Sequence, residues 1–289
     1  MDTTTPTNPQ AAPLVHRMLG MNPSVFTGEG TNTYLVGGFG ADPLLIDTGS
    51  GVEAWTRNLE AYLAAHRLPP PARCLLTHAH PDHIGGAVSL AQRFPTIRFY
   101  KFLYPDWDSQ VKTERGPLEI SPLGDGDSVS GEGYILTAVH TPGHAPDHLC
   151  FVLREENACF TGDMVLGKGT TFIPRTGGNL AVYLESLKTL GRLDLTRIYP
   201  GHGPLVEDPA GKIAGILAHR QAREDQIMEA LAKGGLRLTE LTGRIYAGYP
   251  PDVMGMAGQM VESHLMKLLE DGLVVLSGGE GGIYYRVFK

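Results

Sequence analysis

Short apolar runs and longer amphipathic segments alternate along the first two thirds of the chain. Apolar runs at residues 33–36 and 44–46 flank a glycine-rich turn, so a β-hairpin is expected there. Residues 52–67 place apolar side chains at helical spacing, which predicts an amphipathic helix. The two patterns recur further on, with strands expected at 74–76, 134–139, 149–153, 158–160 and 196–199, and helices at 84–94 and 182–193. Strands alternating with helices predict an α/β domain.

A different order of elements begins after residue 206. One long helix with a polar face is expected at 211–233, and glycines end it. It is followed by two shorter helices, beginning near 239 and at 257–270, and by two alternating strands at 273–276 and 283–287. Helix, helix and hairpin is the order of a winged helix. We therefore expect a disordered tail at 1–13, a catalytic domain at 14–206, and a long helix plus winged-helix-like domain at 207–289.

Composition is that of an ordinary globular protein, with 289 residues, 42% hydrophobic and 19% charged. No apolar stretch has the length of a membrane span, and the first residues lack the basic and apolar regions of a secretory signal. Cys74, Cys150 and Cys159 lie in apolar runs, and their odd number favours reduced thiols, with a Cys150–Cys159 disulfide left open. These features predict a cytoplasmic protein without a membrane partner.

The segment at 77–86 carries the strongest chemical signal. It places His78, His80, Asp82 and His83 within six residues, directly after an apolar strand. Imidazole and carboxylate groups are ordinary ligands of Zn²⁺ and similar metals, whereas crowding them without a cation costs desolvation. A histidine-rich surface loop is the alternative interpretation.

Three later residues of metal-ligating type favour the metal site. His144, Asp163 and His202 each follow a predicted strand, at a point where glycine or proline turns the chain. Loops at the ends of a rigid sheet are where such side chains converge. We therefore expect one site that combines these residues with the segment at 77–86.

Taken together, these residues resemble the metallo-β-lactamase superfamily. The resemblance runs in chain order from Gly30 to Gly203 and includes the segments at 30–36 and 44–49 as well as the histidine motif. It implies an α/β fold, a four-layer αβ/βα metallo-β-lactamase sandwich with a small C-terminal helical, winged-helix-like domain. Segments at 167–171 and 199–204, with His219 and Arg220, look like the LACTB2-like subgroup, which adds such a domain.

The resemblance also implies a ligand set for two metal ions, Zn²⁺ with Fe or Mn as possible substitutes. One ion would be held by His78, His80 and His144, the other by Asp82, His83 and His202, and Asp163 would bridge them. Since no cysteine occupies these positions, the chain departs from the antibiotic-degrading branch that uses a thiolate ligand.

Chemistry for such a pair of ions follows from their charge. Two cations about 3.5–4 Å apart share a hydroxide at neutral pH and polarise the bond under attack. Asp82 is assigned as the catalytic residue that orients this hydroxide. Neither a Gly-x-Ser-x-Gly elbow nor a phosphate-binding loop is present in the sequence.

Five further residues are candidates for orienting ligands or contacting substrate. Asp47 is expected to hydrogen-bond a ligating histidine, and His148 either to orient a ligand or to be an ordinary hydrogen-bonded strand residue. Lys168 and Tyr183 follow Asp163 closely enough to line a cleft, and His219 could reach the rim of the site. Structural roles in loops or helix faces are the alternative for each.

Two functions stay open at this point. One is a dinuclear hydrolase of a small or carrier-bound acyl substrate, such as a thioester, lactone, other ester or β-lactam. The other, suggested by the LACTB2-like resemblance, is a metal-dependent endoribonuclease acting on single-stranded RNA. The net charge of −7 for the chain, and of about −1 for residues 236–289, disfavours nucleic acid, because binding it depends on neutralising phosphates.

Overall fold

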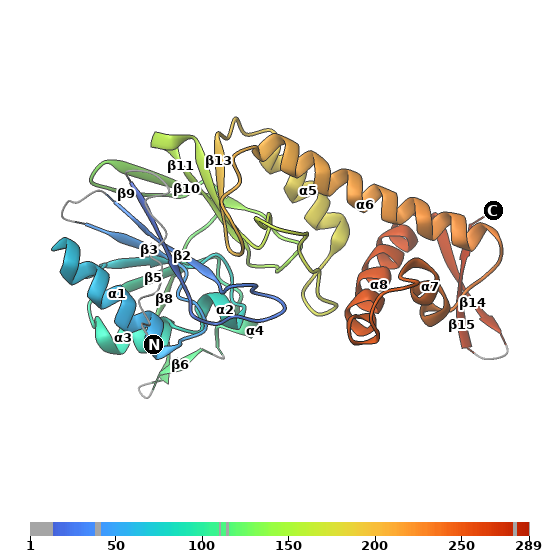
Figure 1. Ribbon diagram of the computed structural model, residues 1–289, viewed down its shortest axis with the longest axis horizontal. Helices are drawn as coiled ribbons and strands as arrows, with labels where there is room; N and C mark the ends of the chain where they lie inside the picture. The colour runs from blue at the N-terminus through green and yellow to red at the C-terminus, as the bar shows by residue number, and fades with distance from the viewer. Residues whose placement is uncertain (1–13, 38–41, 110, 114–115, 280–281, 289) are drawn as a thin grey trace.

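The computed structural model describes residues 14–37, 42–109, 111–113, 116–279 and 282–288. The tail expected at 1–13 lies outside the described residues. Two β-sheets stack face to face in the larger, N-terminal part (Figure 1). The first sheet has the strand order β1 (Val15–Leu19), β2 (Asn32–Val36), β3 (Leu44–Ile46), β4 (Arg73–Leu75), β5 (Arg98–Lys101) and β8 (Ile120–Pro122).

The second sheet is mixed as well. Its strand order is β13 (Arg197–Pro200), β12 (Ala158–Gly162), β11 (Leu149–Leu153), β10 (Tyr134–His140) and β9 (Ser128–Gly131). Strands β12 and β13 run parallel, whereas the other neighbours in this sheet are antiparallel. In the first sheet, β2 and β3 form the antiparallel pair expected for the hairpin, and β3, β4, β5 and β8 run parallel.

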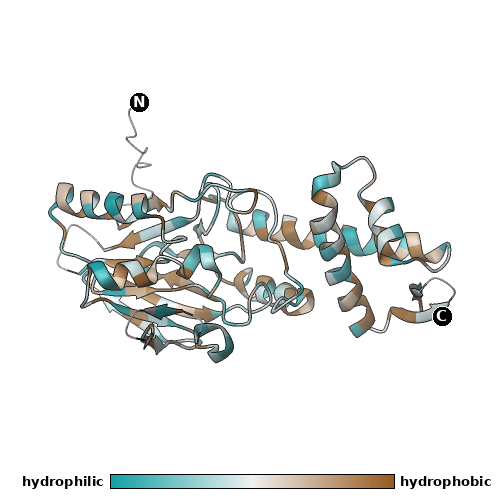
Figure 2. Ribbon diagram, turned by 90° about the horizontal axis from the view of Figure 1, so that it is seen from below, coloured by the Kyte–Doolittle hydropathy of each residue, from teal (hydrophilic) through white to brown (hydrophobic). Residues whose placement is uncertain are grey.

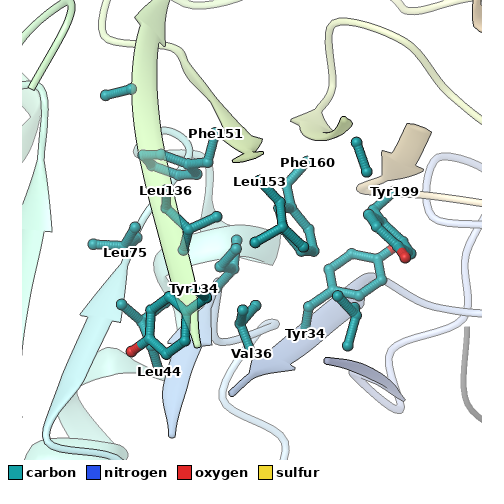
Figure 3. Packing of buried hydrophobic residues seen from close by; sticks show 14 of the residues in the cluster. Tyr34, Val36, Leu44, Leu75, Tyr134, Leu136, Phe151, Leu153, Phe160 and Tyr199 are labelled. Atoms are coloured by element: carbon teal, nitrogen blue, oxygen red, sulfur yellow. The ribbon is translucent and has the colours of Figure 1, made fainter. Parts of the chain in front are cut away.

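The main core lies between the two sheets. Val36 and Leu44 of the first sheet face Leu136, Phe151 and their neighbours of the second (Figure 3). Each sheet is hydrophobic on both faces, because helices cover the outer ones. The sandwich therefore buries three apolar layers, one between the sheets and one under each helical cover.

Helices complete the four layers on the outside. The first sheet is covered by α1 (Glu53–His66) and α3 (Ala87–Arg93), which bury Trp55, Leu59 and Leu90. The second sheet is covered by α5 (Leu180–Leu190) and by the first half of α6 (Pro209–Ala232), which buries Ile213 and Ile216. This arrangement confirms the predicted αβ/βα sandwich (Figure 1).

The single helix expected at 84–94 was wrong. The chain forms a short helix α2 (Pro81–Ile84), passes through Gly85 and Gly86, and then begins α3. The N–H of Gly86 donates to the carbonyl of Gly49 at 3.1 Å, so it leaves the helical ladder. A Cβ on Gly86 would lie 2.2 Å from the carbonyl oxygen of Thr48, which excludes any larger residue. Contact with the 48–49 turn therefore divides the helix.

The C-terminal module packs around the second half of α6. Ile227 and Leu231 of α6 join Leu241, Val261 and Leu265 in a separate core. The module's other elements are α7 (Leu238–Ile245), the 3₁₀ helix η2 (Pro251–Val253), α8 (Met254–Glu270) and the antiparallel strands β14 (Val274–Gly279) and β15 (Gly282–Val287). This order confirms the predicted winged-helix arrangement, and the module projects from one end of the sandwich (Figure 2).

Short elements fill the connections, namely α4 (Pro105–Asp108), β6 (Lys112–Thr113), β7 (Gly116–Pro117) and the 3₁₀ helix η1 (Arg154–Glu156). The three cysteines are buried and free, as the odd count predicted. Across the described residues, no helix combines the length and apolar character that crossing a membrane requires.

Candidate metal centre

The predicted ligands converge at one edge of the sandwich, where several strands end. The histidine motif follows β4 and continues into α2, which carries Asp82 and His83. His144 follows β10, Asp163 follows β12 and His202 follows β13. Four connections of the fold thus deliver side chains to the same place, as loops on a rigid scaffold can.

Their ligating atoms form three overlapping triads. In each triad the atoms lie within 4.8 Å of one another; the triads are His78, His80 and His144; His78, His83 and Asp163; and Asp82, His83 and His202. The first and third are the two predicted metal sites. The second triad places Asp163 between them, with its Oδ1 3.3 Å from His83 Nε2 and its Oδ2 3.5 Å from His144 Nε2.

Ring nitrogens in this cluster face one another closely. His144 Nε2 lies 2.8 Å from His80 Nδ1, and His83 Nε2 lies 3.3 Å from His202 Nε2. Asp163 Oδ1 is buried and makes no hydrogen bond within the described part of the chain. Lone pairs that converge in this way, beside a carboxylate oxygen, fit divalent cations held by nitrogen and oxygen ligands. The donor set therefore fits two metal ions.

Hydrogen bonds to residues outside the ligand cluster fix the orientation of these ligands. His83 Nδ1–H donates to the carboxylate of Asp47 at 2.7 Å, which leaves Nε2 free to face the site. His144 Nδ1–H donates to the carbonyl of Phe172 at 2.8 Å. The backbone N–H of Asp163 donates to Nε2 of His148 at 3.1 Å. Such partners set the tautomer and direction of a metal ligand.

Asp47 is itself held in an unusual conformation. Its φ is +58°, in the left-handed region, and its side chain is buried. Its carboxylate accepts hydrogen bonds from the N–H and the hydroxyl of Thr77, both at 2.8 Å, beside the one from His83. A strained backbone that several contacts hold in place is typical of functional sites.

Electrostatics keep the carboxylates ionised. Burial opposes ionisation of Asp82, but His83 and His202 outweigh it and lower its pKa to about 2. Burial would also lower the pKa of His202, yet Asp163 and Asp82 raise it to about 9. Without metal, protonated imidazoles thus balance the carboxylates. Two cations would supply the same positive charge and free the nitrogens to act as ligands.

In contrast to His202, the histidines on the His80 side of the site have lowered pKa values. Burial, with a smaller contribution from the neighbouring imidazole of His144, lowers the pKa of His80 to about 4. Burial also lowers the pKa of His78 well below its usual range. Both imidazoles are therefore neutral near pH 7, which is the form that binds metal.

A cavity of about 430 Å³ opens above this cluster. His80, Asp82, His144, Asp163 and His202 form its floor. Its walls come from distant parts of the chain, namely Val25 and Phe26, Leu166 and Lys168–Thr170, Phe172 and Pro174, and Met256 at the start of α8. The C-terminal module thus contributes to the wall of the site.

The remaining predicted residues take different positions. Lys168 lines the cavity above the ligand cluster. Tyr183 is fully buried, and its hydroxyl donates to the carbonyl of Met164, so it supports the segment behind Asp163. His219 lines a neighbouring cavity between α6 and α8.

Several residues of the site carried no signal in the sequence. Phe172 orients His144 through its backbone carbonyl, which any residue type could do. The hydroxyl of Thr171 donates to the carbonyl of Asp163 at 2.6 Å. The ring of Trp107 lies 5.7 Å from that of His80. Of these three residues, only Thr171 belongs to a segment that carries the family resemblance, and the resemblance assigns it no role.

Comparison with known proteins agrees with this geometry. The family model of the metallo-beta-lactamase superfamily matches residues 26–202, which include the whole ligand cluster. The chain belongs to this superfamily. A model of the beta-lactamase associated winged helix domain matches residues 238–282, within the C-terminal module.

Fungal members of the superfamily are similar over most of their length. The lactamase-like protein nscB of Aspergillus fumigatus is 36% identical over 96% of this chain and 86% of its own. The atrochrysone carboxyl ACP thioesterase of Emericella nidulans is 37% identical over 92% of this chain and 81% of its own.

Solved structures share both parts of the fold. A metallo-beta-lactamase family protein from Thermus thermophilus is 25% identical with a TM-score of 0.78, covering 96% of this chain and 99% of that one. A beta-lactamase domain protein from Burkholderia ambifaria has a TM-score of 0.84 at 24% identity, covering 96% of this chain and 93% of that one. These structures thus share the fold of the sandwich together with its appended C-terminal module.

Proposed function

We propose that this protein hydrolyses an acyl thioester carried on an acyl carrier protein. The observation that carries the proposal is the intact His/Asp cluster, combined with similarity over 92% of this chain to thioesterases of that substrate class. Water and the thioester give a carboxylic acid and a thiol: a C–O bond forms, the C–S bond breaks, and a proton passes to the departing sulfur.

Seven residues would hold the metal ions in this proposal. They are His78, His80 and His144 at one ion, Asp82, His83 and His202 at the other, and Asp163 between the two. Zn²⁺ suits these ligands best, and Fe or Mn is compatible with them. Bound there, the ions supply a nucleophilic water at neutral pH and polarise the thioester carbonyl.

The chain's own residues prepare the substrate for attack. Asp82 borders the cavity and is ionised, so its carboxylate orients the attacking water by accepting a hydrogen bond from it. Lys168 on the cavity wall offers a positive charge to the oxygen that becomes negative during attack. Val25 and Phe26, which are exposed and also line the cavity, offer apolar surface to the acyl group.

In this proposal the domain boundary lies at 206/207 and separates the metal-binding part of the chain from the part that helps to line the cavity. Residues 14–206 contain all seven proposed ligands, and residues 207–289 contribute Met256 to the cavity wall. The three buried thiols, none of which is in a disulfide, support a reducing compartment such as the cytoplasm.

An endoribonuclease is the second candidate, because the C-terminal module has a winged-helix order of elements. Its charge argues against this use, since residues 236–289 carry about −1 and phosphate binding requires positive charge. The acyl hydrolase therefore ranks first.

A parallel assay tests the proposal. The Zn²⁺-loaded protein is incubated with an acyl carrier protein thioester, a small thioester, a lactone, nitrocefin and single-stranded RNA. Turnover of the carrier thioester at the highest kcat/KM supports the proposal. Preferred cleavage of RNA, or hydrolysis restricted to nitrocefin or the lactone, would overturn it.

Removal of single ligands tests the metal centre. His80→Ala or Asp163→Ala is expected to lower metal content and abolish hydrolysis, because each side chain faces other ligands of the cluster. Metal content by elemental analysis and far-UV circular dichroism are the measurements, and the spectrum should stay unchanged. His66→Ala, at the C-terminal end of α1, is the control. Full activity in either ligand variant would end the dinuclear account.

A further inference from the structure

A second cavity, of about 280 Å³, lies where the sandwich meets the C-terminal module. We call it the junction pocket; it is lined by Thr170–Phe172, by His219, Arg220 and Arg223 of α6, by Tyr246 and Tyr249 after α7, and by Val253, Met256, Ala257, Met260 and His264 of the α8 region. Thr170, Phe172 and Met256 line both this pocket and the metal cavity, so the two share a wall. A long ligand could occupy both.

The lining of the junction pocket carries positive charge without a carboxylate. Arg220 and Arg223 contribute this charge, and no Asp or Glu is among the residues that line the pocket. Burial lowers the pKa of His219 and of His264, so both imidazoles are neutral near pH 7. The neighbouring acid, Glu224, is occupied by Lys267 at 3.1 Å and by His264 at 3.6 Å. Such a lining is unusual in a chain of net charge −7, and it would attract an anion.

Arg220 is the buried one of the two arginines that line the junction pocket. Its residue is 2% exposed, one guanidinium N–H donates to the carbonyl of Thr171, and its Nε has no hydrogen-bond partner within the described residues. No carboxylate of the described chain lies within ion-pair distance of it. A buried guanidinium without a counter-ion costs free energy unless an anion completes its surroundings.

Arg223 is the more accessible of the two arginines. Its guanidinium carbon lies 4.3 Å from the centre of the Tyr246 ring, so the planar group stacks on the tyrosine. Stacking orients a guanidinium while leaving its N–H edge free for a phosphate or carboxylate. Arg223 also makes no ion pair with a carboxylate of the described residues. The two arginines lie about one helical turn apart on α6, and both line the junction pocket.

We propose that the junction pocket binds the phosphate of the carrier protein's 4′-phosphopantetheine arm while its thioester reaches the metal centre. This inference rests on the proposed thioesterase function. The arm joins a phosphate to an extended, partly apolar chain that ends in the sulfur. The pocket offers the matching order, with arginines at one end and the apolar side chains of Phe172 and Met256 on the wall shared with the metal cavity.

An RNA strand fits these observations less well. RNA affinity requires several phosphate contacts along a basic surface. Here Arg220 and Arg223 lie together in one open pocket, with Val253, Met256 and Met260 also among its lining residues. One phosphate attached to an apolar chain is the better match.

Steady-state kinetics with matched substrates tests the pocket. Benzoyl thioesters of pantetheine and of 4′-phosphopantetheine differ only in the phosphate. For the wild type we expect kcat/KM to be about 10-fold or more higher for the phosphorylated substrate, since a charge-assisted contact is of that strength. Arg223→Met should reduce this ratio to within about 3-fold of unity, and Arg223→Lys should restore part of it.

The matched control is Arg244→Met, which removes an exposed arginine of α7 outside the pocket. It should leave the ratio of the two kcat/KM values at its wild-type level. A phosphate preference that survives in Arg223→Met, or that is absent from the wild type, would overturn the inference.

Binding measured without turnover separates this inference from the proposed function. The thioether S-methyl-4′-phosphopantetheine and its dephosphorylated form are titrated into the protein by calorimetry. Tighter binding of the phosphorylated form that Arg223→Met removes supports the pocket, even if no thioester is hydrolysed. Equal binding of the two compounds contradicts it, as does their displacement by a single-stranded RNA that binds the pocket more tightly.

Discussion

At the scale of single residues, the sequence identified side chains whose chemistry and position are both distinctive. The seven candidate ligands are of metal-binding types and follow strand ends, and the structure brings them together. Asp47 and His148 could also be predicted from the sequence. Asp47 follows a recognisable strand, and His148 lies close to the candidate ligand His144. The role of Phe172 could not be predicted, since a backbone carbonyl leaves no trace in residue type.

Asp47 provides the sharpest test at this scale. Asp47→Asn keeps the size of the side chain but replaces an acceptor with an amide that no longer matches both Thr77 and His83. We expect metal affinity to fall by about 10–100-fold, as for other partners of ligating histidines. Competition with a chromophoric chelator measures this change.

The control for that experiment is Asp125→Asn. Asp125 is exposed and accepts a hydrogen bond from the backbone N–H of His140, outside the ligand cluster. Its metal affinity should equal that of the wild type. If Asp47→Asn also bound metal at wild-type affinity, Asp47 would have no role in orienting His83.

At the scale of helices and strands, local patterns predicted most elements but not where contacts divide them. Apolar periodicity continues from Ile84 through Ala87 to Leu90, which favoured one helix. The break at Gly85 and Gly86 depends on contacts with the 48–49 turn, far away in the sequence. Helix α6 was predicted nearly complete, because its caps and length are local features.

The pairing of α6 with α8 depends on a buried carboxylate. Glu224 of α6 accepts a hydrogen bond from Lys267 of α8 at 3.1 Å and faces His264 at 3.6 Å. Burial favours the neutral acid, but these two partners outweigh it and lower the pKa of Glu224 below its ordinary value of 4.5. The folded state therefore prefers the ionised form.

Stability should depend on pH accordingly. A lowered pKa contributes stability that is fully present above the unfolded value, near 4.5, and is lost as the pH falls through the folded value. At pH 7 we expect Glu224→Gln to reduce the free energy of unfolding by about 1–3 kcal/mol. Below pH 4.5 the difference from the wild type should shrink, as urea denaturation at both pH values can measure.

An exposed pair on the same helix serves as the reference. Glu229 lies 3.4 Å from Lys233, and both side chains are mostly exposed. Glu229→Gln should change the free energy of unfolding by less than about 0.5 kcal/mol at either pH. A Glu224→Gln difference that stays constant with pH would rule out the ionised carboxylate as its cause.

At the scale of the whole molecule, the sandwich was predicted through resemblance, whereas periodicity alone indicated only an α/β domain. Long-range order of this kind depends on which strands pair. In the first sheet, β3 pairs with β4, β4 with β5 and β5 with β8, each across intervening elements of the chain. The junction pocket could not be predicted, because it depends on how α8 sits against the 170–172 segment.

Overall charge predicts weak affinity for nucleic acid. With a net charge of −7, the protein should bind single-stranded RNA weakly at about 50 mM salt, and binding should fall further at about 200 mM. Fluorescence anisotropy with a labelled oligonucleotide measures both. Tight binding that is lost on changing Tyr284 or Arg286 would contradict this expectation and favour the endoribonuclease.

Helix α6 has a consequence for how the two parts of the protein can be separated. Its first half fills the core beneath α5, and its second half fills the core of the C-terminal module. If the chain ended before α6, the apolar residues that its first half covers on the sandwich would be exposed to solvent. If the chain were divided after the midpoint of α6, the C-terminal module would lose the helix half that contributes to its core. Neither fragment would therefore be expected to fold independently. A recombination event that exchanged the C-terminal module for another domain would have to include helix α6 as well.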